Sequence, residues 1–126
     1  MKKIVLIDDD RDDAEIFKEA LLEVHPSATF YYFDDAKEAV EKFTEQETDL
    51  PDFIFLDINM PAYTGWQFLA QFKTINHLKN IPVIVYTTSS REREKEIARE
   101  LGAAGFITKP TDYKLVKELL AKHTES

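Results

Sequence analysis

The chain alternates between short apolar runs and longer segments in which apolar residues recur at helical spacing. The apolar runs are four to six residues long, are rich in β-branched or aromatic side chains, and show no regular alternation with polar residues. Such runs are typical of strands that are buried on both faces of a sheet. We therefore predict strands at Ile4–Ile7, Thr29–Phe33, Phe53–Leu56, Ile81–Tyr86 and Gly105–Thr108.

The segments between these runs have the pattern of amphipathic helices. Apolar residues in them recur at i, i+3, i+4 and i+7, which places them on one helical face. Asp34 or Asp35 can cap the second helix, and Gly102 can end the fourth. The helical spacing covers Phe17–Val24, Ala36–Phe43, Gly65–Ile75, Arg91–Leu101 and Tyr113–His123.

Strand and helix therefore alternate as five βα units. Parallel strands joined by helices form a sheet that is covered on both faces, so the predicted fold class is α/β. In an open sheet of this kind, ligands bind beyond the carboxyl ends of the strands.

Length and charge narrow the class of partner. The 126 residues suit one domain, and 44% hydrophobic residues can form a core. A formal net charge of −8 argues against nucleic acid and anionic membranes as partners. The chain has no cysteine and no apolar stretch long enough for a signal peptide or a membrane span, so we expect a cytoplasmic protein.

Polar residues that can do chemistry stand where the predicted strands end. Asp8 and Asp9 follow the first strand, Asp57 follows the third, Thr87 the fourth, and Lys109 the fifth. Three carboxylates at one edge of a sheet form a site for a hard divalent cation, and Mg²⁺ prefers oxygen ligands. The cation would also offset the repulsion between crowded acids.

These groups together predict Mg²⁺-assisted phosphoryl transfer. Asp57 follows "FIFL" directly and is the candidate nucleophile, because a carboxylate there can form an aspartyl phosphate. Lys109 would neutralise phosphoryl charge, and the Thr87 hydroxyl would donate to a phosphoryl oxygen.

Four segments resemble the receiver domains of two-component response regulators. They are "LIDDD", "FLDINMPAYTGW", "VIVYTTSS" and "GAAGFITKP", in matching order and spacing over essentially the whole chain. The resemblance implies a flavodoxin-like, doubly wound sheet of order 2-1-3-4-5. It also implies one receiver domain over residues 1–126, and we expect no output domain because nothing follows Ser126.

The resemblance further implies a role for each site residue. Asp57 would accept a phosphoryl group from the phosphohistidine of a sensor histidine kinase or a histidine phosphotransfer protein. Thr87 and Lys109 would bind that group, and Phe106 would follow Thr87 as a switch. The Lys109–Pro110 bond would be cis. Mg²⁺ would be held by Asp8, Asp9, Asp57 and the backbone carbonyl of Asn59, while Asn59, Thr88 and Ser89 would tune the reaction.

The family also suggests a surface for a downstream protein. It consists of the fourth helix, fifth strand and fifth helix, and the domain would be a monomer or a phosphorylation-dependent dimer. The fourth helix, "REREKEIARE", is either a solvated surface or a marginal helix that shifts on phosphorylation. The candidate contact residues are Lys95, Arg99, Phe106, Tyr113 and Lys117.

Two residues depart from the family pattern. Thr88 stands where a small residue is usual, and its branched side chain would narrow access to Asp57 and slow phosphotransfer. Phe106 replaces the commoner Tyr or His and cannot hydrogen-bond a partner.

Alternative interpretations exist for the acids and for the function. Asp10, Asp12 and Asp13 are best interpreted as favourable partners of a helix dipole. A haloacid-dehalogenase-like phosphatase would need a second acid where Asn59 stands, and a pseudo-receiver would usually lack an acid or the lysine. We therefore expect self-phosphorylation and slow self-hydrolysis rather than enzymatic turnover.

Overall fold

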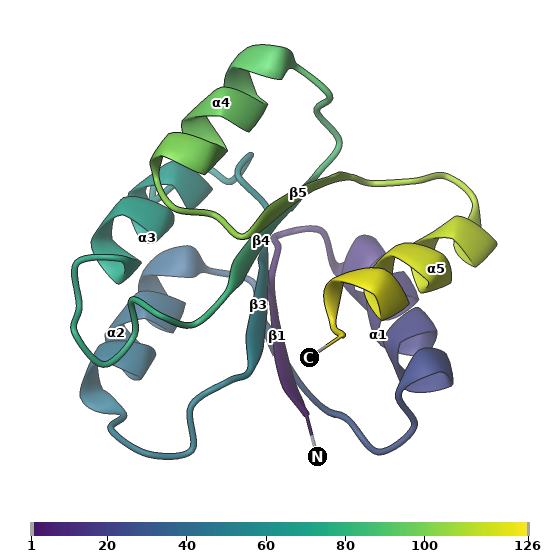
Figure 1. The fold of residues 1–126 in the computed structure, drawn as a ribbon, viewed down its shortest axis with the longest axis horizontal. Helices are drawn as coiled ribbons and strands as arrows, with labels where there is room; N and C mark the ends of the chain where they lie inside the picture. Colours follow the sequence, from purple (N-terminus) through teal and green to yellow (C-terminus); the bar gives the residue numbers. More distant parts are fainter. Residues whose placement is uncertain (1, 126) are drawn as a thin grey trace.

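Five parallel strands form a single sheet in the order β2-β1-β3-β4-β5, as predicted. The computed structural model describes residues 2–125. Figure 1 shows the sheet nearly edge-on in the centre of the molecule. The strands are β1 (Lys3–Ile7), β2 (Thr29–Phe33), β3 (Phe53–Leu56), β4 (Val83–Thr87) and β5 (Gly105–Thr108).

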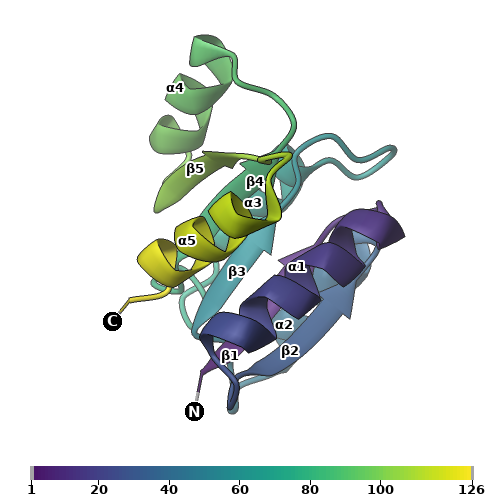
Figure 2. The same cartoon turned by 90° about the vertical axis from the view of Figure 1, so that its right-hand side faces the viewer.

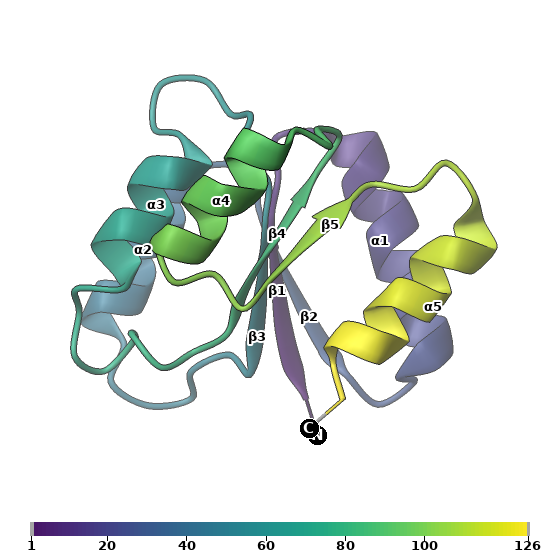
Figure 3. The ribbon, with the colours of Figure 1, turned by 45° about the horizontal axis from the view of Figure 1, so that its top comes forward.

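Helices cover both faces of this sheet. Helices α1 and α5 lie on one face, and α2, α3 and α4 lie on the other (Figures 1 and 3). Figure 2 shows that α1 and α5 pack beside each other. The helices are α1 (Arg11–Val24), α2 (Ala36–Glu45), α3 (Gly65–Phe72), α4 (Glu92–Glu100) and α5 (Tyr113–His123).

The two faces of the sheet carry separate hydrophobic cores. In β1, Val5 and Ile7 pack with residues of α2 and α3, whereas Ile4 and Leu6 pack with residues of α1 and α5. Consecutive residues of a strand point to opposite faces, so a strand that is buried on both sides needs apolar residues throughout. This requirement explains the continuous apolar runs in the sequence.

The boundaries of β4, α3 and α4 differ from the prediction, and local chemistry explains the late start of β4. Strand β4 begins at Val83, after Pro82, because proline has no N–H to donate to the sheet. Helix α3 ends at Phe72 and is followed by turns. Helix α4 begins one residue later than predicted, at Glu92, and Arg91 provides no side-chain cap.

The expectation of a cis Lys109–Pro110 bond is wrong, because residues 2–125 contain no cis peptide bond. The trans form of an X–Pro bond is intrinsically favoured by about 0.5–1 kcal/mol, and the connection from β5 to α5 accommodates it. None of the helices between residues 2 and 125 combines the length and apolar character needed to cross a membrane.

Candidate functional site

The carboxyl ends of four strands bring the predicted site residues together at one edge of the sheet. Backbone hydrogen bonds continue the strand pairing past the strand ends. The N–H of Asp8 donates to Phe33 O at 3.0 Å, and that of Asp57 donates to Ile7 O at 2.9 Å. The N–H of Lys109 donates to the carbonyl of Thr87. The sheet itself therefore fixes where these side chains start.

Three carboxylates at this edge have the arrangement of a metal site. Oxygens of Asp8, Asp9 and Asp57 all lie within 4.8 Å of one another. Asp8 is fully buried and Asp57 is 6% exposed, whereas Asp9 faces solvent. A small all-oxygen set with one side open to water suits Mg²⁺, which keeps several water ligands.

The ammonium group of Lys109 lies among the acids. Its Nζ is 2.8 Å from Asp8 Oδ2 and 3.4 Å from Asp57 Oδ2. Burial alone would lower the pKa of Lys109. The hydrogen bonds to Asp8 and Asp13 and the charges of Asp8 and Asp57 outweigh burial and raise it. Lys109 is therefore a permanent cation beside the candidate nucleophile.

Burial raises the pKa of Asp8, whereas it acts to lower the pKa of Lys109. Removal from water raises the pKa of its carboxyl group to about 6, although the hydrogen bond from Lys109 opposes the rise. The Oδ1 atom of Asp8 also accepts from the backbone N–H of Asp10 at 2.9 Å. The Tyr32 hydroxyl donates to the Asp8 carbonyl at 2.6 Å, so side chain and backbone are both held.

The acids that follow Asp9 have separate roles. Asp10 caps α1, because its Oδ1 accepts from the N–H groups of Asp12 and Asp13 at 3.0 and 3.1 Å. Asp12 is exposed in the first turn, which fits a dipole partner. For Asp13 the dipole interpretation is incomplete, because its Oδ2 lies 2.9 Å from Lys109 Nζ.

Thr87 and its neighbours form a hydrogen-bonded group beside Asp57. The Thr87 Oγ1 accepts from Asn59 Nδ2 at 3.0 Å and from the Ser89 N–H at 3.4 Å. The N–H of Asn59 donates to Asp57 Oδ1 at 3.0 Å. The Ser89 hydroxyl donates to Glu94 of α4. Two of the residues expected to tune the reaction, Asn59 and Ser89, are thus linked to Thr87, and Ser89 also contacts α4.

Phe106 lies on the α4 side of the sheet. Its partly buried ring packs against a small cluster of Ile58, Val85 and Ala98. This packing places it between β4 and α4, and its role as a switch stays a prediction.

The suggested partner surface is divided between two sides of the molecule. Lys95 and Arg99 line a shallow hollow of about 320 Å³ between α4 and β5, together with Phe106. Tyr113 and Lys117 instead contact Glu23 of α1, at 2.8 and 3.3 Å. Those two side chains therefore face the α1–α5 side.

A groove of about 540 Å³ opens beside the site. It runs between the start of α1 and the β5–α5 connection, and exposed Thr88 lies on its wall. Its lining residues are Asp13, Ile16, Tyr86, Thr88, Lys109, Pro110, Thr111, Tyr113 and Val116.

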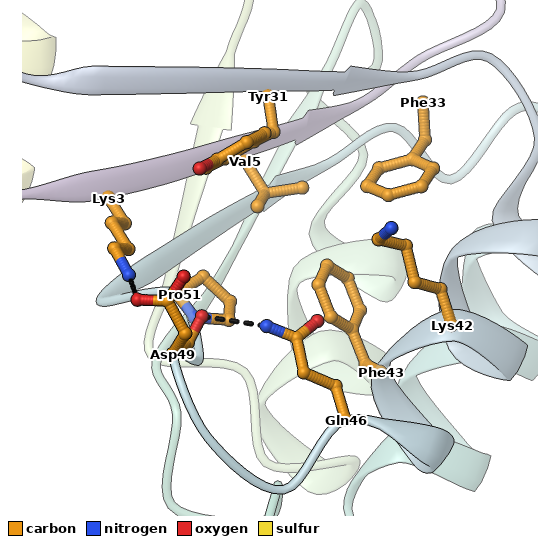
Figure 4. Close-up of a pocket in the computed structure, with 9 residues that line it drawn as sticks. All are labelled: Lys3, Val5, Tyr31, Phe33, Lys42, Phe43, Gln46, Asp49 and Pro51. Atoms are coloured by element: carbon orange, nitrogen blue, oxygen red, sulfur yellow. Dashed lines mark hydrogen bonds and ion pairs between the residues drawn. The ribbon is translucent and has the colours of Figure 1, made fainter.

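A second hollow, of about 220 Å³, lies between β2 and α2 (Figure 4). Figure 4 shows the Lys42 side chain extending from α2 toward the Phe33 and Phe43 rings, which contact each other edge to face with their centroids 5.5 Å apart. At its other end Lys3 pairs with Asp49. None of the site residues at the carboxyl ends of the strands lines this hollow, so we do not assign it to the phosphoryl chemistry.

Sequence reasoning missed two residues around Lys109. Asp13 contacts the ammonium directly, and the Tyr86 ring centroid lies 5.6 Å from Lys109 Nζ. The third position after the Asp10 cap was an available signal for Asp13, because the first turn of α1 starts at the same sheet edge.

Comparisons of sequence identify the family. The response regulator receiver domain family matches residues 4–121. Protein PilH of Pseudomonas aeruginosa is 30% identical over 113 residues, which is 89% of this chain and 88% of PilH. A Vibrio cholerae protein named probable cyclic di-GMP phosphodiesterase is 29% identical over 98% of this chain. The chain spans only 26% of that longer relative.

Solved structures agree with this match. The phosphorylated cyanobacterial phytochrome response regulator RcpA superposes with a TM-score of 0.86 at 30% identity, covering 97% of this chain and 90% of RcpA. The Mn²⁺-bound response regulator Rcp1 gives 0.84 at 28% identity, covering 97% and 91%. The chain belongs to the response regulator receiver domain family, whose members act in two-component phosphorelay signalling.

Proposed function

We propose that Asp57 is the phosphoacceptor of this receiver domain. The observation that carries the proposal is the nearly buried Asp57 carboxylate, which lies 3.4 Å from the Lys109 ammonium and forms a carboxylate triad with Asp8 and Asp9. The donor would be the phosphohistidine of a sensor histidine kinase or a histidine phosphotransfer protein. A carboxylate oxygen of Asp57 would attack phosphorus, the phosphorus–nitrogen bond would break, and the histidine nitrogen would leave with the electron pair.

Asp8, Asp9 and Asp57 would hold Mg²⁺, together with the Asn59 carbonyl. When bound, the ion supplies positive charge next to the transferring phosphoryl oxygens. The chemistry of the donor set fits, because it is made of oxygens and Asp9 is open to water. The Mn²⁺ in Rcp1 supports a divalent ion in this family.

Lys109 and Thr87 would bind the phosphoryl group on Asp57. Lys109 supplies a fixed charge, and Thr87 supplies a hydroxyl that has to leave its present partner Asn59 or rotate. That movement, followed by Phe106, would change the α4–β5 surface and its affinity for a downstream protein. Phosphorylation shifts such an equilibrium only through different interactions with the two states.

The chemistry is self-modification followed by slow self-hydrolysis, rather than turnover of a metabolite. The side chain at Asn59 is an amide, so it cannot protonate a leaving group as a phosphatase acid would. A cytoplasmic location goes with this proposal, because a kinase that uses ATP would supply the phosphohistidine.

The test is phosphoryl uptake measured by intact mass. Incubation with a small acyl phosphate and Mg²⁺ should add one phosphoryl group. Omission of Mg²⁺, or the Asp57→Ala substitution, should abolish the gain. Circular dichroism of the variant would show that it is folded. If the folded wild-type domain gains no phosphoryl group from acyl phosphate or from phosphohistidine donors, the proposal is wrong and a pseudo-receiver becomes the better description.

A further inference from the structure

Lys109 has more carboxylate partners than phosphoryl binding requires. An ammonium group has three hydrogens to donate. The Nζ of Lys109 lies 2.8 Å from Asp8, 2.9 Å from Asp13 and 3.4 Å from Asp57. The two shortest contacts therefore go to residues other than the phosphoacceptor.

Asp13 is held in place from its own helix. It lies in the first turn of α1, and its N–H donates to the Asp10 cap at 3.1 Å. Its side chain is 34% exposed, whereas that of Lys109 is 9% exposed. The Nζ of Lys109 also lies over the Tyr86 ring, 5.6 Å from the ring centroid. Asp13 thus joins α1 to the end of β5 across the groove beside the site.

Asp13 differs from the other two partners in what the reaction demands of it. On the proposed function, from which this argument starts, Asp8 and Asp57 turn toward Mg²⁺ and the phosphoryl group. Asp13 is outside the carboxylate triad that can hold the ion. Among the described residues, it is therefore the carboxylate partner of Lys109 that stays available when the metal and the phosphoryl group arrive.

We propose that Asp13 is a positioning residue that anchors Lys109 through the phosphoryl transfer step. With Asp13 in place, the position of the Lys109 ammonium is fixed, and the ammonium can direct a hydrogen toward phosphoryl oxygens on Asp57. Without Asp13, the carboxylate partners left to Lys109 within residues 2–125 are Asp8 and Asp57, and it competes with Mg²⁺ for them. Misplacement of a charged group by a small distance is costly when catalysis depends on preorganised charge.

The test compares Asp13→Asn with Asp12→Asn. Asp12 is an exposed acid in the same helical turn, so its substitution removes the same charge without touching Lys109. Uptake from acyl phosphate is timed by intact mass at a Mg²⁺ concentration that calorimetry shows to saturate each variant. We expect Asp13→Asn to slow uptake at least about fivefold, a barrier increase of about 1 kcal/mol, and Asp12→Asn to change it less than twofold. Asp13→Glu should restore most of the rate.

A second measurement reports the contact without chemistry. In protein labelled with ¹⁵N at lysine side chains, the Nζ resonance of Lys109 is assigned by its loss in Lys109→Ala. It should shift in Asp13→Asn and stay in Asp12→Asn. Equal uptake rates in the two Asn variants, or an unmoved resonance, would overturn the proposal. Failure of the wild type to take up phosphate would instead count against the proposed function, while the resonance would still report on the Asp13 contact.

Discussion

Asp8 shows at the scale of one residue how function opposes stability. Its carboxylate is fully buried, and burial raises its pKa to about 6. At neutral pH the group is therefore ionised at a cost that Lys109 offsets only in part. Such a cost is common where a site requires a charged ligand, and it is kept because the charge serves binding.

Asp8→Asn should therefore stabilise the metal-free domain at pH 7, by about 1–3 kcal/mol given the size of the pKa rise. The folded pKa lies above the ordinary value of 3.8. At Asp8 the folded state consequently holds more protons between roughly pH 4 and 6, so the contribution of Asp8 to wild-type stability increases as pH falls through this window. Urea unfolding in EDTA at pH 7 and pH 5 measures both effects.

The difference in free energy of unfolding between wild type and Asp8→Asn isolates the contribution of Asp8 from those of other titrating groups. The advantage of Asp8→Asn should be smaller at pH 5 than at pH 7. A variant less stable than wild type at pH 7 would mean that the ion pair with Lys109 outweighs burial.

Thr88 concerns access rather than stability. It is exposed and lines the same groove as Lys109, whose Nζ lies 3.4 Å from Asp57 Oδ2. We expect Thr88→Ala to speed uptake from acyl phosphate about two- to fivefold, less than about 1 kcal/mol of activation free energy. Thr111→Ala, on the same groove beyond Pro110, is the matched control. Unchanged or slower uptake in Thr88→Ala would show that Thr88 does not restrict access.

At the scale of elements, α4 is the helix with the weakest local support. No side chain caps its start, and its ion pairs Arg93–Glu96 and Lys95–Glu92 are exposed i,i+3 pairs at 3.5 and 3.3 Å. Exposed pairs of this kind contribute only about 0.2–0.5 kcal/mol each. Glu94, which lies three residues after Arg91, accepts a hydrogen bond from the Ser89 hydroxyl. The loop after β4 thereby holds α4 in place of a cap.

Helix α3 has strong local support at its start, in contrast to α4. Its first residue, Gly65, fits tightly against the backbone of Asp57 and Ile58. A Cβ on Gly65 would lie 2.5 Å from the Asp57 carbonyl oxygen and 2.6 Å from Ile58 Cα. Thr64 and Gln67 form a capping box that fixes this helix end. Gly65 thus allows α3 to approach the backbone that carries Asp57, the proposed phosphoacceptor.

We expect Gly65→Ala to destabilise the domain by about 1–3 kcal/mol, the usual cost of overpacking. Phosphoryl uptake should fall as well, because relief of the clash has to move the backbone of Asp57. Urea unfolding and intact mass measure the two effects. Gly105→Ala is the control, since its Cβ would lie 3.3 Å from the His123 side chain and 3.6 Å from Ile84 Cγ2, and would meet side chains rather than backbone. Equal losses in both variants would contradict the argument.

At the scale of the molecule, the sequence predicted the elements better than their mutual contacts. Apolar runs identify strands that are buried on both faces, because each face requires apolar side chains, as in β1 and β3. The strand order came from the family resemblance, since periodicity carries no information about neighbours. The strand-end rule placed Asp8, Asp57, Thr87 and Lys109 correctly at one edge.

The contact between Asp13 and Lys109 could not be predicted in the same way. The two residues are separated by 96 positions. Their contact forms because both side chains adopt rotamers that bring them together in the groove. Thr87 with Asn59 is a similar case, because side-chain hydrogen bonds depend on distances that spacing along the chain does not fix. Local pattern predicts which edge a residue reaches, and packing decides which partner it meets there.

Metal binding should stabilise the whole fold, because the triad is assembled only when β1 and β3 are paired. At free Mg²⁺ a hundredfold above its Kd, mass action adds about 2.7 kcal/mol, which raises Tm by several degrees in a domain of this size. A chain of net charge −8 also gains from any cation, so NaCl at matched ionic strength is the required baseline. Asp9→Asn removes the exposed carboxylate of the triad with little loss of packing, and the Mg²⁺-dependent rise in Tm of this variant should be much smaller. Equal rises in Tm for wild type and Asp9→Asn would mean that Mg²⁺ acts by screening alone. The triad would then not be a metal site.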